Sequence, residues 1–204
     1  MPTPGVIFDM DGALLRVDVD VEEVRQRLAA LFAPYGVARP FRPILKTLRE
    51  AARDARKPEL YAEGLAILSD WEVRGAVAAR ARDGAVEATT ALAKSGVPLG
   101  LVTDVGRAAV VSALRTAGLD PVRFTAIVTR DDVPAPKPDP AMVRRAADEL
   151  GGTPTWYVVD HQKDIDAGRA AGVRVAALVG GLTSLRGADV VVASLRDVPA
   201  LVLA

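Results

Sequence analysis

Two carboxylates stand two positions apart where a short apolar run of the chain ends. Residues 6–15 read VIFDMDGALL, so Asp9 closes the run and Asp11 follows it. Like charges at this spacing resist ionising together unless a cation lies between them. The pair therefore belongs either to a solvated turn or to a cation site. The turn is the weaker interpretation, because an Asn-Gly pair would suit a hairpin better and a helical pattern follows.

Five further polar residues follow the ends of later apolar runs, where a parallel sheet would gather them at one edge. They are Thr103, Asp104, Lys137, Asp160 and Asp164. The oxygens of Asp9, Asp11 and Asp160 suit Mg²⁺, which prefers hard ligands. Thr103 and Lys137 offer a phosphate a hydroxyl donor and a cation, and the helix after Thr103 would add backbone N–H groups. Such a set can perform phosphoryl transfer with a carboxylate as nucleophile.

Short apolar runs alternate with helical patterns along most of the chain. Runs that are bounded by turn residues predict strands buried on both faces, as in a parallel sheet. Their positions are 5–9, 97–104, 124–129, 155–160, 173–180 and 189–194. The helical patterns between them, one with Asp83 as its expected N-cap, complete βαβ units. We therefore expect an α/β fold, with a Rossmann-like parallel sheet and helices on both of its faces.

One segment interrupts this alternation. Between residues 17 and 82 the apolar spacing is helical, and no strand-like run of this kind occurs. Val24, Leu28 and Leu31, for example, fall on one face of a helix that begins near residue 20. We expect a small all-helical cap at 17–82, inserted into a Rossmann-like core that is formed by 1–16 and 83–204.

Four short motifs, taken in their order along the chain, resemble those of the haloacid dehalogenase-like hydrolase superfamily. They are DMDG, then VTD at a strand end, then KP, then DHQKDIDAG. More narrowly, the chain is similar to phosphoglycolate-phosphatase-like members with a helical cap after the first strand. The resemblance spans the whole chain. It implies a Mg²⁺-dependent phosphatase that hydrolyses a small phosphorylated metabolite through an aspartyl-phosphate.

The resemblance also implies a role for each acidic motif residue. Asp9 would be the nucleophile, and Asp11 would protonate the leaving oxygen and later activate water. Mg²⁺ would be held by Asp9, the backbone carbonyl of Asp11, and Asp160. Asp164 would stand behind them as a partner of the Mg²⁺ waters or of the lysine, although it could equally cap the next helix. A carboxylate at Asp11 favours phosphate esters over the dehalogenation known in the same superfamily.

The phosphate would be held by Thr103 and Lys137, and the motif also places Asp104 at the phosphate site. Lys137 would restrain Asp9 as well. Asp104 replaces the usual Asn, and an additional negative charge facing the phosphate would weaken its binding. Other departures from the common pattern are Ala13, Arg16, Val159 and His161. They bear on rate and substrate more than on the class of reaction.

The composition gives no support to several other functional classes. Lys plus Arg and Asp plus Glu both number 26, so the zero net charge does not point to nucleic acid or an anionic membrane as partner. No apolar run approaches the roughly 18 residues of a membrane span, and the N-terminus lacks the features of a signal peptide. Without cysteine there are no disulfides and no thiolate metal sites. We expect a cytoplasmic protein, and the sequence indicates no oligomeric state.

Two other functions stay open at this point. A β-phosphoglucomutase-like phosphomutase would use the same aspartyl-phosphate and return the group to its substrate. A protein of this fold with reduced or lost catalysis would serve a binding or regulatory role. A signalling receiver domain is less consistent with the chain, because its phosphoacceptor would have to be Asp70, which lies in a helical pattern.

Overall fold

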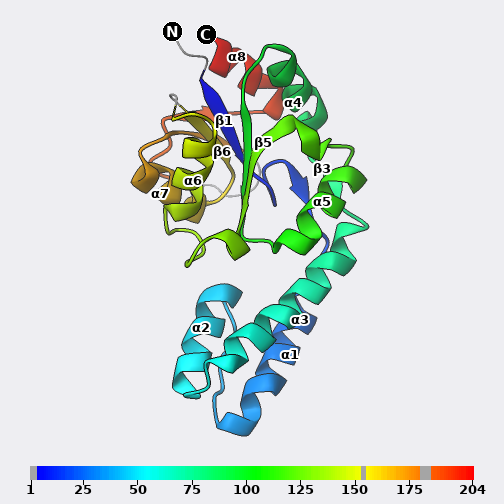
Figure 1. Cartoon of the computed structure of the whole chain (residues 1–204), viewed down its shortest axis with the longest axis vertical. Coiled ribbons are helices and arrows are strands. Elements are labelled where there is room, and N and C mark those ends of the chain that lie inside the picture. Colours follow the sequence, from blue (N-terminus) through cyan, green and yellow to red (C-terminus); the bar gives the residue numbers. More distant parts are fainter. Residues whose placement is uncertain (1–3, 153–154, 180–184) are drawn as a thin grey trace.

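A six-stranded parallel sheet forms the body of the molecule (Figure 1). The computed structural model describes residues 4–152, 155–179 and 185–204. The strand order is β5-β4-β1-β6-β7-β8, so the first strand lies inside the sheet. The bounds of the strands are β1 (Gly5–Asp9), β4 (Leu99–Thr103), β5 (Phe124–Thr129), β6 (Thr155–Val159), β7 (Arg174–Leu178) and β8 (Val190–Val192).

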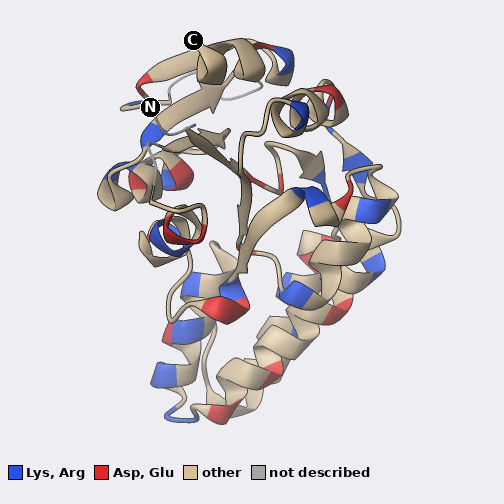
Figure 2. Cartoon of the chain, turned by 45° about the horizontal axis from the view of Figure 1, so that its top comes forward, with Lys and Arg blue, Asp and Glu red and all other residues tan. Residues whose placement is uncertain are grey.

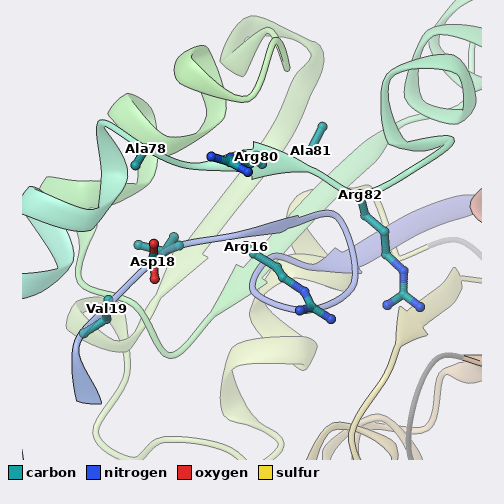
Figure 3. A pocket seen from close by; sticks show the side chains of 8 residues that line it. Arg16, Asp18, Val19, Ala78, Arg80, Ala81 and Arg82 are labelled. Carbon is teal, nitrogen blue, oxygen red and sulfur yellow. The ribbon is translucent and has the colours of Figure 1, made fainter. Parts of the chain in front are cut away.

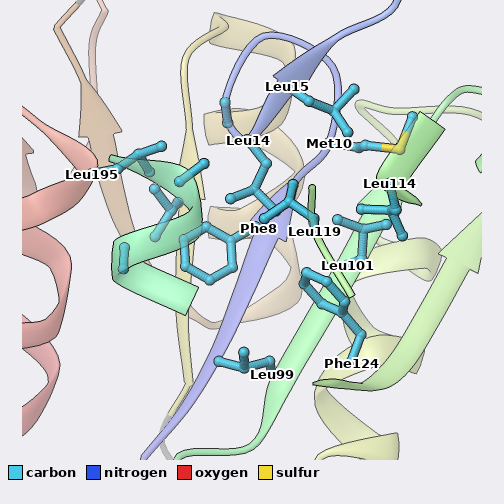
Figure 4. Packing of buried hydrophobic residues seen from close by; sticks show 14 of the residues in the cluster. Phe8, Met10, Leu14, Leu15, Leu99, Leu101, Leu114, Leu119, Phe124 and Leu195 are labelled. Carbon is cyan, nitrogen blue, oxygen red and sulfur yellow. The ribbon is translucent and has the colours of Figure 1, made fainter. Parts of the chain in front are cut away.

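Helices cover both faces of the sheet, because successive side chains of each strand point to opposite faces. Val6 and Phe8 of β1 pack with α4, α5 and α8 in the cluster that Figure 4 shows. Ile7 points the other way and packs with α6 and α7. The predicted Rossmann-like α/β fold is confirmed. These helices are α4 (Ala85–Lys94), α5 (Arg107–Thr116), α6 (Ala141–Glu149), α7 (Gln162–Ala171) and α8 (Val198–Leu203).

Three more helices form a separate unit, which we call the cap and which lies below the sheet in Figure 1. They are α1 (Val21–Phe32), α2 (Ile44–Asp54) and α3 (Glu59–Ala76). Their apolar faces meet in a core of their own, where Leu28, Phe32, Phe41 and Leu48 are fully buried. The ring centroids of Phe32 and Phe41 lie 5.6 Å apart. The cap therefore has its own hydrophobic core.

Two short strands, which we call the stem, join the cap to the sheet. They are β2 (Leu15–Arg16) and β3 (Arg80–Ala81), and they pair antiparallel. The sequence predicted no strand between 17 and 82, and β3 corrects this, because a two-residue strand is too short to stand out as an apolar run. Helix α3 of the cap also packs against α5 of the core. The exact division of the chain at 16/17 and 82/83 stays a prediction.

Helix α4 begins differently from the prediction. Gly84, with φ of 82°, is the N-cap residue in place of Asp83. Asp83 instead forms an ion pair with Arg196, which lies just before α8. Arg196 also pairs with Glu87 at 2.8 Å. A carboxylate near a helix start can thus be taken by a cation from a distant part of the chain.

Four short 3₁₀ helices complete the described structure. They are η1 (Ala33–Tyr35), η2 (Pro121–Arg123), η3 (Arg130–Asp132) and η4 (Leu195–Asp197).

Charged residues of both signs are spread over cap and core (Figure 2). Within the described residues, no helix combines the length and the apolar character needed to cross a membrane.

Candidate active site

Three adjacent strands bring predicted site residues to one edge of the sheet. β1 ends at Asp9, between β4, which ends at Thr103, and β6, which Asp160 follows. Because the strands are parallel, their final residues emerge at the same edge, on the side where the cap lies (Figure 1). The structure therefore gathers residues from positions 9, 103 and 160 around one strand end.

Lys137 is buried between two carboxylates at this edge. Its Nζ contacts Asp9 Oδ1 and lies 2.7 Å from Asp164 Oδ1. The hydroxyl of Tyr157 lies 3.5 Å from the same nitrogen. Lys137 is 6% exposed, Asp9 is 4% exposed and Asp164 is fully buried. These carboxylates supply the negative charge without which a buried ammonium is unfavourable.

Asp164 acts on this lysine although it lies in the first turn of α7. Neither of its carboxylate oxygens has a hydrogen-bond partner among the described residues, so its contact with Lys137 is an ion pair without directed hydrogen-bond geometry. Of the two roles open to Asp164 from the sequence, helix capping has no contact to support it.

Burial and neighbouring charges together set the pKa values of Asp9 and Lys137. Loss of solvent raises the pKa of Asp9 to about 8, while the attraction of Lys137 acts in the opposite direction. Loss of solvent also acts to lower the pKa of Lys137, but the negative charges around it, Asp9 foremost, outweigh this and hold it well above its ordinary value. The ammonium therefore stays protonated at neutral pH. A further cation beside Asp9 would favour its ionised, nucleophilic form.

Asp11 follows β1 in the turn that leads to the stem. Its side chain is exposed, and its Oδ1 accepts the backbone N–H of Val17 at 3.1 Å. The surrounding protein nevertheless removes enough solvent to raise the pKa of Asp11, and repulsion from Asp160 adds to this, whereas the hydrogen bond from Val17 acts against it. A carboxyl group with a raised pKa is suited to giving and taking a proton near neutral pH.

Asp160 binds two cationic or polar side chains. His161 Nδ1 lies 2.7 Å from its Oδ1, and Arg82 Nη1 lies 3.5 Å from its Oδ2. The hydrogen bond to Asp160 raises the pKa of His161. Arg82 also donates to the backbone carbonyl of Gly12 at 2.6 Å, which ties the stem to the turn after β1. His161 itself is exposed.

The turn after β1 lies directly against Asp160, and this close approach tests whether a divalent cation would fit. Gly12 has φ of 101°, and a Cβ at this position would lie 2.5 Å from Asp160 Oδ2. The carboxylate of Asp160 and the backbone of the turn thus converge. The predicted donors, Asp9, the backbone carbonyl of Asp11 and Asp160, are all oxygens of the kind Mg²⁺ prefers, so the residues fit the ion.

A different set of acidic and histidine side chains lies closest together. Among the described residues, the only three whose ligand atoms all lie within 4.8 Å of one another are Asp160, His161 and Asp164. The predicted set does not need this closeness between side chains, because Asp11 would contribute its backbone carbonyl. An imidazole nitrogen is also a poorer ligand for Mg²⁺ than a carboxylate.

Asp104 lies beside the site but is already neutralised by cations. Its Oδ1 accepts the backbone N–H of Lys137 at 3.1 Å, and its Oδ2 lies 2.7 Å from Lys163 Nζ. Burial would raise the pKa of Asp104, but Lys137 and Lys163 outweigh this and lower it. The charge that replaces the usual Asn is therefore ionised and paired.

The start of α5 is occupied by protein groups. Gly106 is the N-cap, and its N–H donates to Glu72 Oε2 at 3.0 Å, while the N–H of Arg107 donates to Asp131 Oδ2 at 2.8 Å. The sequence predicted that backbone N–H groups of this helix would serve a phosphate. These two are taken by carboxylates instead. Thr103, which is buried, accepts the N–H of Val105 at 3.1 Å through its Oγ1.

Two hollows lie near these residues without containing Asp9. The larger, of about 650 Å³, lies along the stem and is shown in Figure 3. Its lining includes Arg16, Arg80 and Arg82, and Arg82 connects it to Asp160. The second, of about 240 Å³, lies between cap and core beside the loop that leads to Lys137. It is lined by Leu45, Arg49, Tyr61 and Leu65 of the cap and by Arg130, Asp131, Val133, Pro134 and Pro136 of the core.

Sequence reasoning missed three residues at this site. Arg82 and Lys163 bind the carboxylates of Asp160 and Asp104, and Arg130 holds the backbone of Asp104. Arginine is frequent in this chain, and nothing in the spacing of the arginines distinguishes Arg82 and Arg130 from the others. Lys163 did carry a signal, because it lies inside the fourth motif and lysine is rare, with five in 204 residues.

Comparisons with known proteins agree with this geometry. The family described as haloacid dehalogenase-like hydrolase matches residues 6–178. A phosphoglycolate phosphatase of Cereibacter sphaeroides is 30% identical over 191 residues, covering 87% of this chain and 86% of its own length. A validoxylamine A 7'-phosphate phosphatase of Streptomyces hygroscopicus subsp. limoneus is 30% identical over 194 residues, covering 90% and 87%.

A solved structure gives the same picture of the fold. The structure of CbbY from Rhodobacter sphaeroides in complex with phosphate matches with a TM-score of 0.72 and covers 97% of this chain and 96% of its own. The two sequences are 22% identical. At this identity the likeness shows a shared fold alone.

Proposed function

The chain belongs to the haloacid dehalogenase-like hydrolases, and we propose that it is a Mg²⁺-dependent phosphatase acting through an aspartyl-phosphate. Its resemblance to phosphoglycolate-phosphatase-like proteins is confirmed, and the chain is a phosphoric monoester hydrolase. The observation that carries the finer proposal is Lys137, buried between Asp9 and Asp164 at the end of β1, with Asp11 two residues beyond. This arrangement supports the proposal that Asp9 is the nucleophile, Lys137 the cation and Asp11 the acid.

In the proposed reaction Asp9 attacks phosphorus and Asp11 moves the protons. An oxygen of Asp9 bonds to phosphorus while the bond between phosphorus and the ester oxygen breaks. Asp11 gives its proton to that leaving oxygen. It then takes a proton from the water that attacks the aspartyl-phosphate, which releases inorganic phosphate and restores Asp9.

The remaining residues would hold charge in place during these steps. Lys137 restrains Asp9 and, with Thr103, would bind oxygens of the phosphoryl group. Asp9, the carbonyl of Asp11 and Asp160 would hold Mg²⁺, which when bound neutralises developing negative charge. Asp164 keeps Lys137 in position from behind.

A colorimetric assay with one variant tests this proposal. Purified protein should hydrolyse p-nitrophenyl phosphate with Mg²⁺ and stop when EDTA is added. Asp9→Asn should fold, as judged by circular dichroism, and lose at least about 10³-fold in kcat, because an amide is a poor nucleophile. Turnover that persists in EDTA, or full activity of Asp9→Asn, would sink the mechanism.

The substrate is proposed only as a class. The two relatives described above are named for different phosphate esters, phosphoglycolate and validoxylamine A 7'-phosphate. We therefore propose a small phosphorylated metabolite of the cytoplasm and no nucleic-acid or membrane partner. A panel of phosphorylated metabolites that includes 2-phosphoglycolate identifies the ester by its kcat/KM, since the cap and not the motifs selects it.

A further inference from the structure

A buried ion pair joins the cap helix α3 to the core. Glu72 lies on α3, and Arg130 opens η3 at the end of β5. Arg130 Nη1 lies 2.5 Å from Glu72 Oε1, and their side chains are 5% and 6% exposed. A pair so far removed from water is unfavourable unless its remaining hydrogen-bonding groups are also satisfied. Among the described residues, every buried polar atom of the two side chains has a partner except Arg130 Nε, which lies 3.7 Å from Asp131 Oδ1 without a hydrogen bond. The partners of the other atoms show what the pair does.

Both members of the pair reach the turn between β4 and α5. Arg130 Nη1 also donates to the backbone carbonyl of Asp104 at 2.8 Å. Glu72 accepts the backbone N–H of Gly106 at 3.0 Å through its second oxygen. Arg130 Nη2 donates to Ser69 Oγ on α3 at 2.8 Å. The turn, the guanidinium and the cap helix are therefore fixed to one another by four separate contacts.

The packing at this point leaves no spare room. A Cβ at Gly106 would lie 2.7 Å from Arg130 Nη2 and 3.2 Å from Ser69 Oγ. The end of an arginine usually moves aside, but this one is held by two residues of α3 and by a backbone carbonyl. Close approach and hydrogen bonding together specify one position of α3 relative to the turn.

The same turn carries two parts of the proposed site. Thr103 immediately precedes it, and the carboxylate of Asp104 accepts the N–H of Lys137. Arg130 thus donates to the backbone carbonyl of Asp104, and the carboxylate of Asp104 accepts the backbone N–H of Lys137 in the next loop of the site. If α3 moved away, Glu72 would leave Arg130 without its charge partner and the Gly106 N–H without its acceptor.

We infer that Glu72 and Arg130 are positioning residues through which the docking of α3 sets the geometry of the turn at residues 104–106, which adjoins Thr103 and holds the backbone of Lys137. The inference rests on the proposed function. Neither side chain is required to touch the substrate, since both act through the backbone of residues 104–106. The phosphate site is fully formed only while α3 is docked on the core.

Two matched substitutions on α3 test this inference. Glu72→Gln keeps the shape of the side chain and removes its charge, and Asp70→Asn makes the same change where Asp70 pairs with Arg74 on the exposed face of the helix. Calorimetry with inorganic phosphate and Mg²⁺ measures binding, and hydrogen exchange measures protection of the Gly106 amide. We expect Glu72→Gln to bind phosphate at least tenfold more weakly and to exchange at least tenfold faster, while Asp70→Asn matches the wild type.

Two further variants keep the test decisive if Glu72→Gln folds poorly. Arg130→Lys keeps the charge but cannot bridge Glu72 and the Asp104 carbonyl, so phosphate affinity should fall about as far. Ser69→Ala removes one weaker contact and should cost about threefold. Wild-type phosphate affinity in Glu72→Gln or Arg130→Lys overturns the inference. The inference is also overturned if phosphate affinity falls in every variant, Asp70→Asn included, and falls only in proportion to the drop in that variant's thermal midpoint.

The proposed function and this inference fail in different measurements. Absence of Mg²⁺-dependent turnover in the wild type would overturn the phosphatase mechanism. Phosphate affinity and Gly106 exchange require no turnover, so they would still decide whether α3 controls the turn.

Discussion

At the scale of single residues, charge pairing decides what the departures from the family pattern mean. Asp104 was predicted to weaken phosphate binding if its charge faced the phosphate. In the structure Lys163, one residue before Asp164, lies 2.7 Å from Asp104 Oδ2. Lys163 thus compensates the charge of Asp104, and the net charge of this pair is that of an uncharged Asn.

This pairing predicts a double-mutant cycle. Lys163→Met should raise KM for a phosphate monoester about two- to fivefold, because it exposes the substrate to an uncompensated carboxylate and the pair is partly screened by solvent. Asp104→Asn combined with Lys163→Met should return KM to near the wild-type value. Steady-state kinetics of the four proteins measure the coupling, and strictly additive effects of the two substitutions would contradict it.

The same scale shows where sequence reasoning ends. Asp9, Asp160 and Asp164 could be placed because each lies at or just after a strand end whose position follows from an apolar run. Arg82 and Arg130 could not, because their partners lie 78 and 58 positions away and only the folded chain brings them together. Pairings over such distances leave no local pattern.

At the scale of elements, the short helix η3 shows how a loop is fixed near the site. Thr129 and Asp132 form a reciprocal cap, in which Asp132 Oδ2 accepts the N–H and the hydroxyl of Thr129, both at 2.8 Å. Arg107 of α5 also binds Asp132, at 2.5 Å. The loop that leads to Lys137 therefore leaves β5 in a defined direction.

The cap of η3 predicts a pH-dependent contribution to stability. Partial burial would raise the pKa of Asp132, but hydrogen bonds from Thr129 and pairing with Arg107 lower it. A lowered folded-state pKa means that the contribution is present above the unfolded value, near 4, and is lost as pH falls through the folded value. Asp132→Asn should therefore lower the free energy of unfolding by about 1 kcal/mol at pH 7.

Urea denaturation at several pH values checks this prediction. The difference between wild type and Asp132→Asn should shrink below about pH 4. A difference that stays constant from pH 7 to pH 3 would show that the carboxylate charge has no part in it. Glu149→Gln, which alters an exposed pair with Arg145, serves as the control.

The elements themselves were largely predictable. Six apolar runs gave the six sheet strands, because a strand buried on both faces must be apolar along its length. The two strands of the stem were missed, since two residues cannot form a run. The N-cap at Asp83 was wrong because Arg196, far along the chain, competes for the same carboxylate.

At the scale of the whole molecule, a neutral chain concentrates opposite charges at one edge of the sheet. Among the residues that the structure describes, Asp9 and Asp164 share a single ammonium, and Asp160 has only a guanidinium at 3.5 Å and an exposed imidazole. The edge thus carries more carboxylate than internal cations neutralise closely. A bound divalent cation should therefore stabilise the entire fold.

This charge imbalance predicts a Mg²⁺-dependent thermal shift. At a Mg²⁺ concentration of about 100 times Kd, the free energy of unfolding should rise by about 2.7 kcal/mol, equivalent to about 5 to 10 °C in Tm for a chain of this size. Asp160→Asn should abolish the shift. Differential scanning fluorimetry measures it, and an equal shift in Asp160→Asn would place the ion elsewhere.

The stem has a consequence for how proteins of this kind diversify. The cap has a hydrophobic core of its own and connects to the sheet through two short strands and one docked helix. Substitutions on α2 can therefore accumulate without entering the packing of the sheet. Laboratory selection for a new ester should collect its first changes on the α2 surface that faces the core, around Leu45 and Arg49. In evolutionary terms, the chemistry and the docked helix α3 are inherited, and α2 is free to vary.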